Sequence, residues 1–125
     1  MSVVRTVLGD VPADRLGMCF AHEHLVIDGG VPLLVNPELS LPRVEDAVAE
    51  LAPCVAAGVR AVVDAMPADA GRNVAKLAAI SRRAGVHVVA ATGRQEVREL
   101  PFPRLRAALV AAGAVLDPDL AASTP

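Results

Sequence analysis

Short apolar runs and longer amphipathic segments alternate along the chain. The runs are rich in valine and alanine and are bounded by glycine, proline or aspartate, which is typical of buried strands. They predict strands over residues 18–27, 59–65 and 86–91. A weakly alternating stretch at residues 3–8, followed by a turn signal at Gly9–Asp10, predicts a small hairpin before the first of these strands.

Two segments between the strands repeat apolar residues every three or four positions, which predicts amphipathic helices over residues 43–57 and 73–84. Gly58 and Gly85 follow them as helix stops. Pro53 should kink or shorten the last turn of the first helix, because it lacks a backbone N–H. The second helix is expected to bury the face that carries Val74, Leu77, Ala78 and Ser81.

Two further stretches lack strong periodicity. Residues 28–42 contain three prolines and few helix formers, so we expect a loop there. A loop at the carboxyl end of a strand is where parallel α/β folds keep their chemistry. Residues 94–125 change character and predict a divergent tail, with a helix at 103–112.

The resulting β-α-β-α-β-α order predicts an α/β fold with parallel strands, because the crossovers are too long for hairpins. A doubly wound sheet and part of a (β/α)8 barrel both fit this order. A Gly-x-Gly-x-x-Gly motif does not follow the first strand, so the dinucleotide-binding fingerprint is missing. A complete small domain with a flavodoxin-like layout is a further alternative, although it needs two more strands.

Composition narrows the class of protein. With 125 residues, 54% of them hydrophobic, and a formal charge of -2, the chain predicts one folded domain. It has no excess basic charge and only two aromatic residues, so we expect no nucleic-acid partner. No apolar run is long enough for a membrane span, and the two cysteines form no CxxC pair. We therefore expect a cytoplasmic protein with no membrane partner.

The strongest chemical signal is the pair His22 and His24, at positions i and i+2 of an apolar strand. Alternate strand residues point to one face, so the two imidazoles are expected to lie side by side. Neutral imidazole is a common ligand for zinc and related divalent metals. Two buried, hydrogen-bonded histidines are the alternative explanation.

Other polar residues could have a functional or a purely structural role. Asp64, at the end of the second strand, could orient a histidine or a metal-bound water, or it could cap the next loop. Asp28 has the same two interpretations, and a turn is the usual role of aspartate before Gly-Gly. His87 is expected to be a structural residue. Glu23 should face away from the two histidines as a buried or helix-facing acid. Arg72 is expected to be a solvated surface arginine, and the alternative is that it helps to bind an anionic ligand at the start of the second helix.

Several segments together resemble the phosphotriesterase family of the amidohydrolase superfamily. They are Val4-Arg5-Thr6-Val7-Leu8-Gly9, Leu16-Gly17, His22-Glu23-His24-Leu25, Val62-Val63-Asp64-Ala65-Met66-Pro67, Gly71-Arg72-Asn73, Ile80-Ser81-Arg82-Arg83-Ala84-Gly85-Val86 and Val89-Ala90-Ala91-Thr92-Gly93. They occur in the family's order from about Val4 to Gly93, which is far more specific than the histidine pair alone.

The resemblance implies a (β/α)8 barrel with a binuclear metal centre, commonly zinc, at the carboxyl ends of its strands. Family members hydrolyse phosphotriesters, lactones or related esters with a metal-bridging hydroxide. His22 and His24 match the two ligands of the first strand. A small ester or lactone is the substrate that this resemblance implies.

The chain also departs from the family pattern. The remaining ligands are a carboxylated lysine, two histidines and an aspartate on later strands, whereas the only lysine, Lys76, lies in the second predicted helix. A complete barrel needs about 200 residues or more. We therefore expect residues 1–93 to be the N-terminal part of such a barrel, truncated and with little or no activity. The alternative is a non-catalytic fragment or subunit that completes a barrel with a partner, or associates with itself through open sheet edges.

Overall fold

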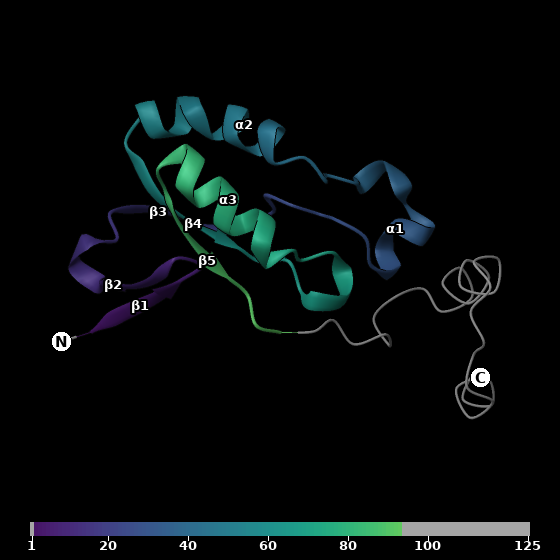
Figure 1. Cartoon of the computed structure of the whole chain (residues 1–125), viewed down its shortest axis with the longest axis horizontal. Coiled ribbons are helices and arrows are strands. Elements are labelled where there is room, and N and C mark those ends of the chain that lie inside the picture. Colours follow the sequence, from purple (N-terminus) through teal and green to yellow (C-terminus); the bar gives the residue numbers. More distant parts are fainter. Residues whose placement is uncertain (1, 94–125) are drawn as a thin grey trace.

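The structure, a computed structural model, describes residues 2–93, so the predicted tail at 94–125 and its helix at 103–112 lie outside the described residues (Figure 1). An antiparallel hairpin comes first and a parallel sheet with the order β3-β4-β5 follows. The strands are β1 (Val3–Thr6), β2 (Gly9–Pro12), β3 (Met18–Glu23), β4 (Val59–Asp64) and β5 (His87–Ala90). The helices are α1 (Val31–Val35), α2 (Val44–Ala56) and α3 (Val74–Ala84), with 3-10 turns at Ala13–Arg15, Pro37–Leu39 and Ala68–Ala70.

The core lies between the sheet and the two longer helices. Figure 1 shows α2 and α3 side by side over one face of the sheet. Apolar side chains from both helices and all three parallel strands or their flanking residues meet there, and burying them is the main driving force for folding. The fully or nearly fully buried members are Val26, Ala47, Leu51, Val59, Val62, Leu77, Ile80, Val86 and Val88. The predicted α/β arrangement with parallel strands is confirmed.

Helix α3 shows how local signals fix an element. Asn73 caps its first turn, with the side-chain oxygen accepting a hydrogen bond from the Lys76 N–H, and Gly85 ends it in the left-handed conformation. The buried face contains Leu77, Ile80 and Ser81. The prediction that Val74 belongs to this face was wrong, because Val74 is 48% exposed in the first turn.

Helix α2 continues past its internal proline. Pro53 lies inside the helix, which ends only at Ala56, so the predicted shortening is not observed. The Ala57 N–H donates to the Pro53 carbonyl, and the Gly58 N–H donates to the carbonyl of Val55. These bonds complete the last turn beyond the proline, and Gly58 then leaves the helix with a φ of 107°.

The N-terminal hairpin turns earlier than predicted. Thr6 pairs with Gly9, so the tip is Val7–Leu8, and Gly9 and Asp10 belong to the second strand. The Thr6 hydroxyl stabilises the tip by donating to the Gly9 carbonyl and accepting from the Leu8 N–H. The Val7 N–H donates to the Val88 carbonyl at 2.9 Å, which joins the hairpin tip to β5.

The segment after β3 is more ordered than the predicted loop at residues 28–42. It contains helix α1 and the 3-10 turn at Pro37–Leu39. Proline is favourable in the first turn of a helix because its missing N–H is not needed there. Pro32 and Pro37 both occupy such positions, so two of the three prolines that indicated a loop instead begin helical turns.

No helix within residues 2–93 is both long and apolar enough to cross a bilayer.

Candidate metal centre

The two predicted metal ligands lie next to each other at the end of β3. His22 is in the strand, and His24 follows Glu23, the last strand residue. Their ring centroids are 5.3 Å apart with an angle of 87° between the ring planes. Both residues are exposed. The structure therefore brings the imidazoles together, although the strand predicted to reach residue 27 ends before His24.

The pairing of β3 with β4 shifts just before this ending. Phe20 pairs with Val62 and Glu23 with Asp64, so β3 carries one more residue than β4 between these pairs. Such a bulge bends a strand and changes its side-chain alternation. Paired residues share a face of the sheet, so Glu23 lies on the face of Asp64 and the neighbouring His22 on the other face. Glu23 faces away from His22 as predicted, but it is exposed and is therefore not the buried acid of the first alternative.

Asp64 connects the ends of β3 and β4. Its side chain is fully buried (0% exposed), with Oδ2 accepting from the Leu25 N–H at 2.8 Å and Oδ1 from the Met66 N–H at 3.0 Å. The bond to Met66 is the predicted cap of the following loop. The bond to Leu25 reaches the residue directly after His24, which the sequence did not indicate.

A polar cluster holds the segment that follows the histidines. Lys76 Nζ lies 2.7 Å from Asp28 Oδ2, and the Asn73 side-chain N–H donates to the same oxygen at 3.0 Å. The hydrogen bond from Lys76, and then the one from Asn73, hold the pKa of Asp28 below its usual value. Asp28 was expected to make a turn or to support the histidine site, and its ion pair with Lys76 was not predicted. The partners are far apart in the sequence, and no local pattern could have paired them.

The loops at this end of the sheet also approach each other through glycine. A Cβ atom on Gly71 would lie 2.7 Å from the Gly29 carbonyl oxygen and 2.8 Å from the Asp28 nitrogen. A Cβ on Gly30 would lie 2.7 Å from the Asp69 carbonyl oxygen. Both glycines also have a positive φ, which residues with a side chain rarely adopt. The close contacts and the backbone conformation therefore both exclude larger residues at these two positions.

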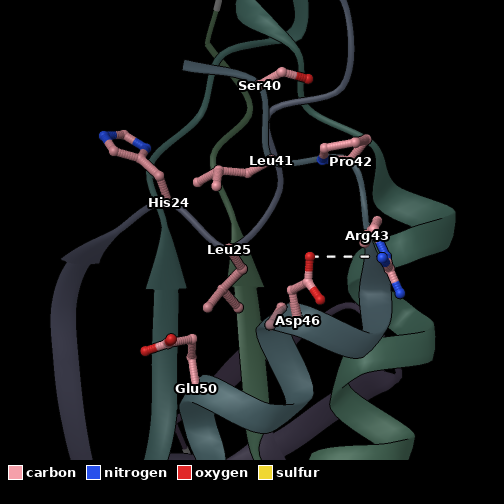
Figure 2. A pocket seen from close by; sticks show the side chains of 9 residues that line it. His24, Leu25, Ser40, Leu41, Pro42, Arg43, Asp46 and Glu50 are labelled. Carbon is pink, nitrogen blue, oxygen red and sulfur yellow. Dashed lines mark ion pairs between the residues drawn. The ribbon is translucent and has the colours of Figure 1, made fainter. Parts of the chain in front are cut away.

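A cavity of about 150 Å³ lies beside His24, between residues 40–43 and α2. Figure 2 shows the His24 imidazole pointing away from Asp46 and Glu50, which project from α2. Asp46 is instead paired with Arg43 at 3.8 Å. Within residues 2–93, histidine, cysteine and acidic side chains nowhere gather in a group of three that could hold a metal ion.

The spacing of the two imidazoles is compatible with a shared metal ion. On a tetrahedral zinc ion, each ring centroid would lie about 3 Å from the metal, which puts two centroids about 5 Å apart. The observed 5.3 Å agrees with this spacing. The described residues thus offer two ligands, and a closed site needs further ones.

Two other residues can be compared with their predictions. His87 is the first residue of β5, at the opposite end of the sheet from the histidine pair, as expected for a structural residue. Arg72 is only half-buried, and its guanidinium donates to the Ala91 carbonyl. It therefore joins the start of α3 to the end of β5, and its expected role as a solvated arginine was wrong.

Comparison with known proteins identifies related sequences. The pattern of the phosphotriesterase family matches residues 2–112, which extends beyond the segments quoted above. A phospho-furanose lactonase of Mycoplasmopsis agalactiae is 35% identical over 92 residues, covering 72% of this chain and 26% of that protein. A phospho-furanose lactonase of Mycoplasmopsis synoviae is 29% identical over 92 residues, covering 71% of this chain and 26% of that protein. The chain thus spans about a quarter of the length of these relatives.

Solved structures give the same relationship. An amidohydrolase from Mycoplasma synoviae superposes with a TM-score of 0.68 at 29% identity, covering 73% of this chain and 27% of that one. A lactonase from Listeria monocytogenes gives a TM-score of 0.67 at 30% identity, covering 74% of this chain and 28% of that one. These matches confirm that the described residues form the N-terminal part of a (β/α)8 barrel, and they favour it over the doubly wound alternatives.

Proposed function

The chain belongs to the phosphotriesterase family, and from this premise we propose that it supplies two metal ligands, His22 and His24, to a hydrolase that acts on lactones or related esters. The observation that supports the proposal most is the 5.3 Å spacing of the two imidazole centroids at the carboxyl end of β3. The substrate class follows the lactonases among the relatives. Phosphotriesters are the second substrate class to test.

The chain's own residues would act by binding and orientation. His22 and His24 would hold a divalent ion, zinc in the first instance, through neutral ring nitrogens. When bound, such an ion supplies an activated water as nucleophile near neutral pH and polarises the oxygen of the attacked group. Asp28, Lys76 and Asn73 would keep the segment after the histidines in place beside the site.

We further propose that residues 1–125 by themselves have little or no hydrolytic activity. Two imidazoles without further gathered ligands hold a metal only weakly, because affinity depends on ligand number and geometry. The sequence outside this pair contains a single further histidine, His87, and a single lysine, Lys76. His87 lies at the opposite end of the sheet, and the ammonium of Lys76 is bound to Asp28 and Pro42.

Zinc titration and activity assays of the purified chain test both parts. Wild type should bind zinc, His22→Ala and His24→Ala should bind it more weakly, and His87→Ala should not differ from wild type. Assays with a γ-lactone and with a phosphotriester should give no zinc-dependent turnover. Equal binding by all four proteins would overturn the ligand assignment. Zinc-dependent turnover that His22→Ala abolishes would overturn the proposed inactivity.

A second candidate function is that of a module that completes a barrel with another polypeptide. Within the described residues, β3 forms an edge of the sheet. It exposes Met18 (59%) and Phe20 (36%), an apolar surface that a neighbouring strand or helix could cover. Light scattering after size exclusion should then show association, and Phe20→Ser should reduce it. A monomer at all concentrations, with no change in Phe20→Ser, would contradict this function.

A further inference from the structure

We propose that Asp64 is a positioning residue for His24, which it orients by binding the backbone on the carboxyl side of that histidine. The inference rests on the proposed function, in which His24 is a metal ligand. In this role Asp64 touches neither the metal nor the imidazole of His24. Both carboxylate oxygens of Asp64 accept backbone N–H groups, and the side chain has no exposed surface.

The peptide groups on both sides of His24 are held by the same short segment of β4 and its loop. On the amino side, the Glu23 carbonyl accepts from the Ala65 N–H at 2.9 Å. On the carboxyl side, the Leu25 N–H donates to Asp64 Oδ2 at 2.8 Å. These two peptide groups define φ and ψ of His24, so fixing both sets the direction of its Cα–Cβ bond. His22 is already fixed within β3.

A carboxylate suits this position because the strand ladder ends here. Glu23 pairs with Asp64, and beyond this pair the Leu25 N–H bonds to the Asp64 side chain. The second oxygen accepts the Met66 N–H, so one side chain serves donors from two strand ends. An ionised carboxylate offers only acceptors, whereas the amide of asparagine would point an N–H group at one of the two donors. Leaving a buried donor unpaired is unfavourable.

The anchoring also extends to the third strand. The Asp64 backbone carbonyl accepts from the Ala91 N–H at 3.0 Å, and Asp64 pairs with Ala90 in the sheet. The side chain is therefore rigidly placed before it binds the Leu25 N–H. Outer-shell groups that orient a metal-ligating histidine, usually by a hydrogen bond to its ring, typically cost about 10–100-fold in metal affinity when they are lost. Asp64 would impose a similar constraint through the backbone.

The test compares Asp64→Asn with Ser81→Ala in the full chain. Ser81 is a matched control because it is also buried and its hydroxyl donates to the Val86 carbonyl at 2.6 Å, at the other end of β5. Zinc affinity is measured by competition with a chromophoric chelator, and stability by urea unfolding. The His22–His24 ring contact is followed by nuclear Overhauser effects in the metal-free chain. Hydrogen exchange is also measured in wild type, where the Leu25 amide should be protected by its bond to Asp64.

We expect Asp64→Asn to weaken zinc binding about 10–100-fold and to reduce the ring contact, while Ser81→Ala leaves both unchanged despite its lower stability. Equal losses in the two variants would show a role in stability alone and overturn the proposal. An unprotected Leu25 amide in wild type would also overturn it. If wild type binds no zinc, the proposed function fails, and the ring contact in metal-free Asp64→Asn decides the positioning role by itself.

Discussion

The ammonium of Lys76 lies 2.7 Å from the carboxylate of Asp28 and donates a second hydrogen bond to the Pro42 carbonyl at 2.6 Å. Asp28 begins the segment after the histidine pair, and Pro42 lies at its end. One side chain of α3 thus holds both ends of this segment. The arrangement keeps the segment against the helix, while α1 in its middle contacts the 3-10 turn at Ala68–Ala70.

Acid should weaken this connection. The folded chain holds the pKa of Asp28 below its usual value, so the unfolded chain takes up the proton at higher pH than the folded chain does. The contribution of Asp28 to stability is therefore complete above about pH 4 and is lost as the pH falls towards the folded-state pKa. Urea unfolding at about pH 7 and about pH 3 should show a smaller acid effect in Asp28→Asn than in wild type.

The control for this prediction is a double-mutant cycle. Lys76→Met removes the partner charge while retaining the aliphatic part of the side chain. The effects of Asp28→Asn and Lys76→Met at neutral pH should be less than additive in the double variant, because each removes the same ion pair. Strict additivity, or an unchanged acid effect in Asp28→Asn, would contradict the assigned interaction.

Capping of α3 by Asn73 should contribute measurably to stability. Its side-chain oxygen accepts the Lys76 N–H at 3.1 Å, so loss of the cap in Asn73→Ala should cost about 1 kcal/mol in the free energy of unfolding. Asn73→Ser keeps an acceptor at this position and should be less destabilising. Alanine and serine both lose the bond to Asp28, so the difference between these two variants reports the cap. Thermal or urea unfolding measures both. Equal stability of the two variants would show that the cap contributes little.

The two glycines with nearly the same φ should respond differently to a methyl group. A Cβ on Gly58 (φ 107°) would enter open space, whereas a Cβ on Gly71 (φ 109°) would collide with the Gly29 oxygen. Gly58→Ala should therefore cost only the backbone strain, about 1–2 kcal/mol. Gly71→Ala should cost about 1–3 kcal/mol more, through the steric conflict. Similar unfolding midpoints for the two variants would contradict the close approach of the loops.

The assignment of the buried face of α3 can be tested in the same way. Leu77 is completely buried, and Leu77→Ala should lower the free energy of unfolding by about 2–5 kcal/mol. Val74 is 48% exposed, and Val74→Ala should change it by no more than about 0.5 kcal/mol. If both variants lost a comparable amount of stability, Val74 would belong to the buried face, as the sequence pattern predicted.

Local patterns predicted the middle of the fold well, because each element carries its own boundary signals. Helix α3 begins after Asn73 and ends at Gly85, and β4 follows directly from Gly58. The end of β3 could not be predicted in this way. The apolar run continues through Leu25, Val26 and Ile27, but the strand ends at Glu23. Beyond Glu23, the Leu25 N–H bonds to the side chain of Asp64, which lies 39 residues later in the sequence.

In the candidate site, too, local sequence predicted some features, whereas others depend on contacts between distant residues. The i and i+2 spacing predicted adjacent imidazoles, and His22 and His24 are adjacent. Their role as metal ligands stays a prediction. The ion pair of Asp28 with Lys76 depends on how a loop and a helix pack, so no spacing rule could identify it. Choosing the barrel over a doubly wound sheet also required the family resemblance, since the order of elements fits both.

The close approach of Gly30 and Gly71 has a practical consequence for protein engineering. These glycines and the Asp28–Lys76 pair fix the root of the segment at residues 28–42, while Leu34 and Leu39 in its middle are exposed. Leu33 packs against the buried side chains of Ile27, Met66 and Ala70 and should be kept with the root. A library that varies residues 34–40 should therefore yield mostly folded variants. That would make the segment a graft site for new recognition loops beside the histidine pair.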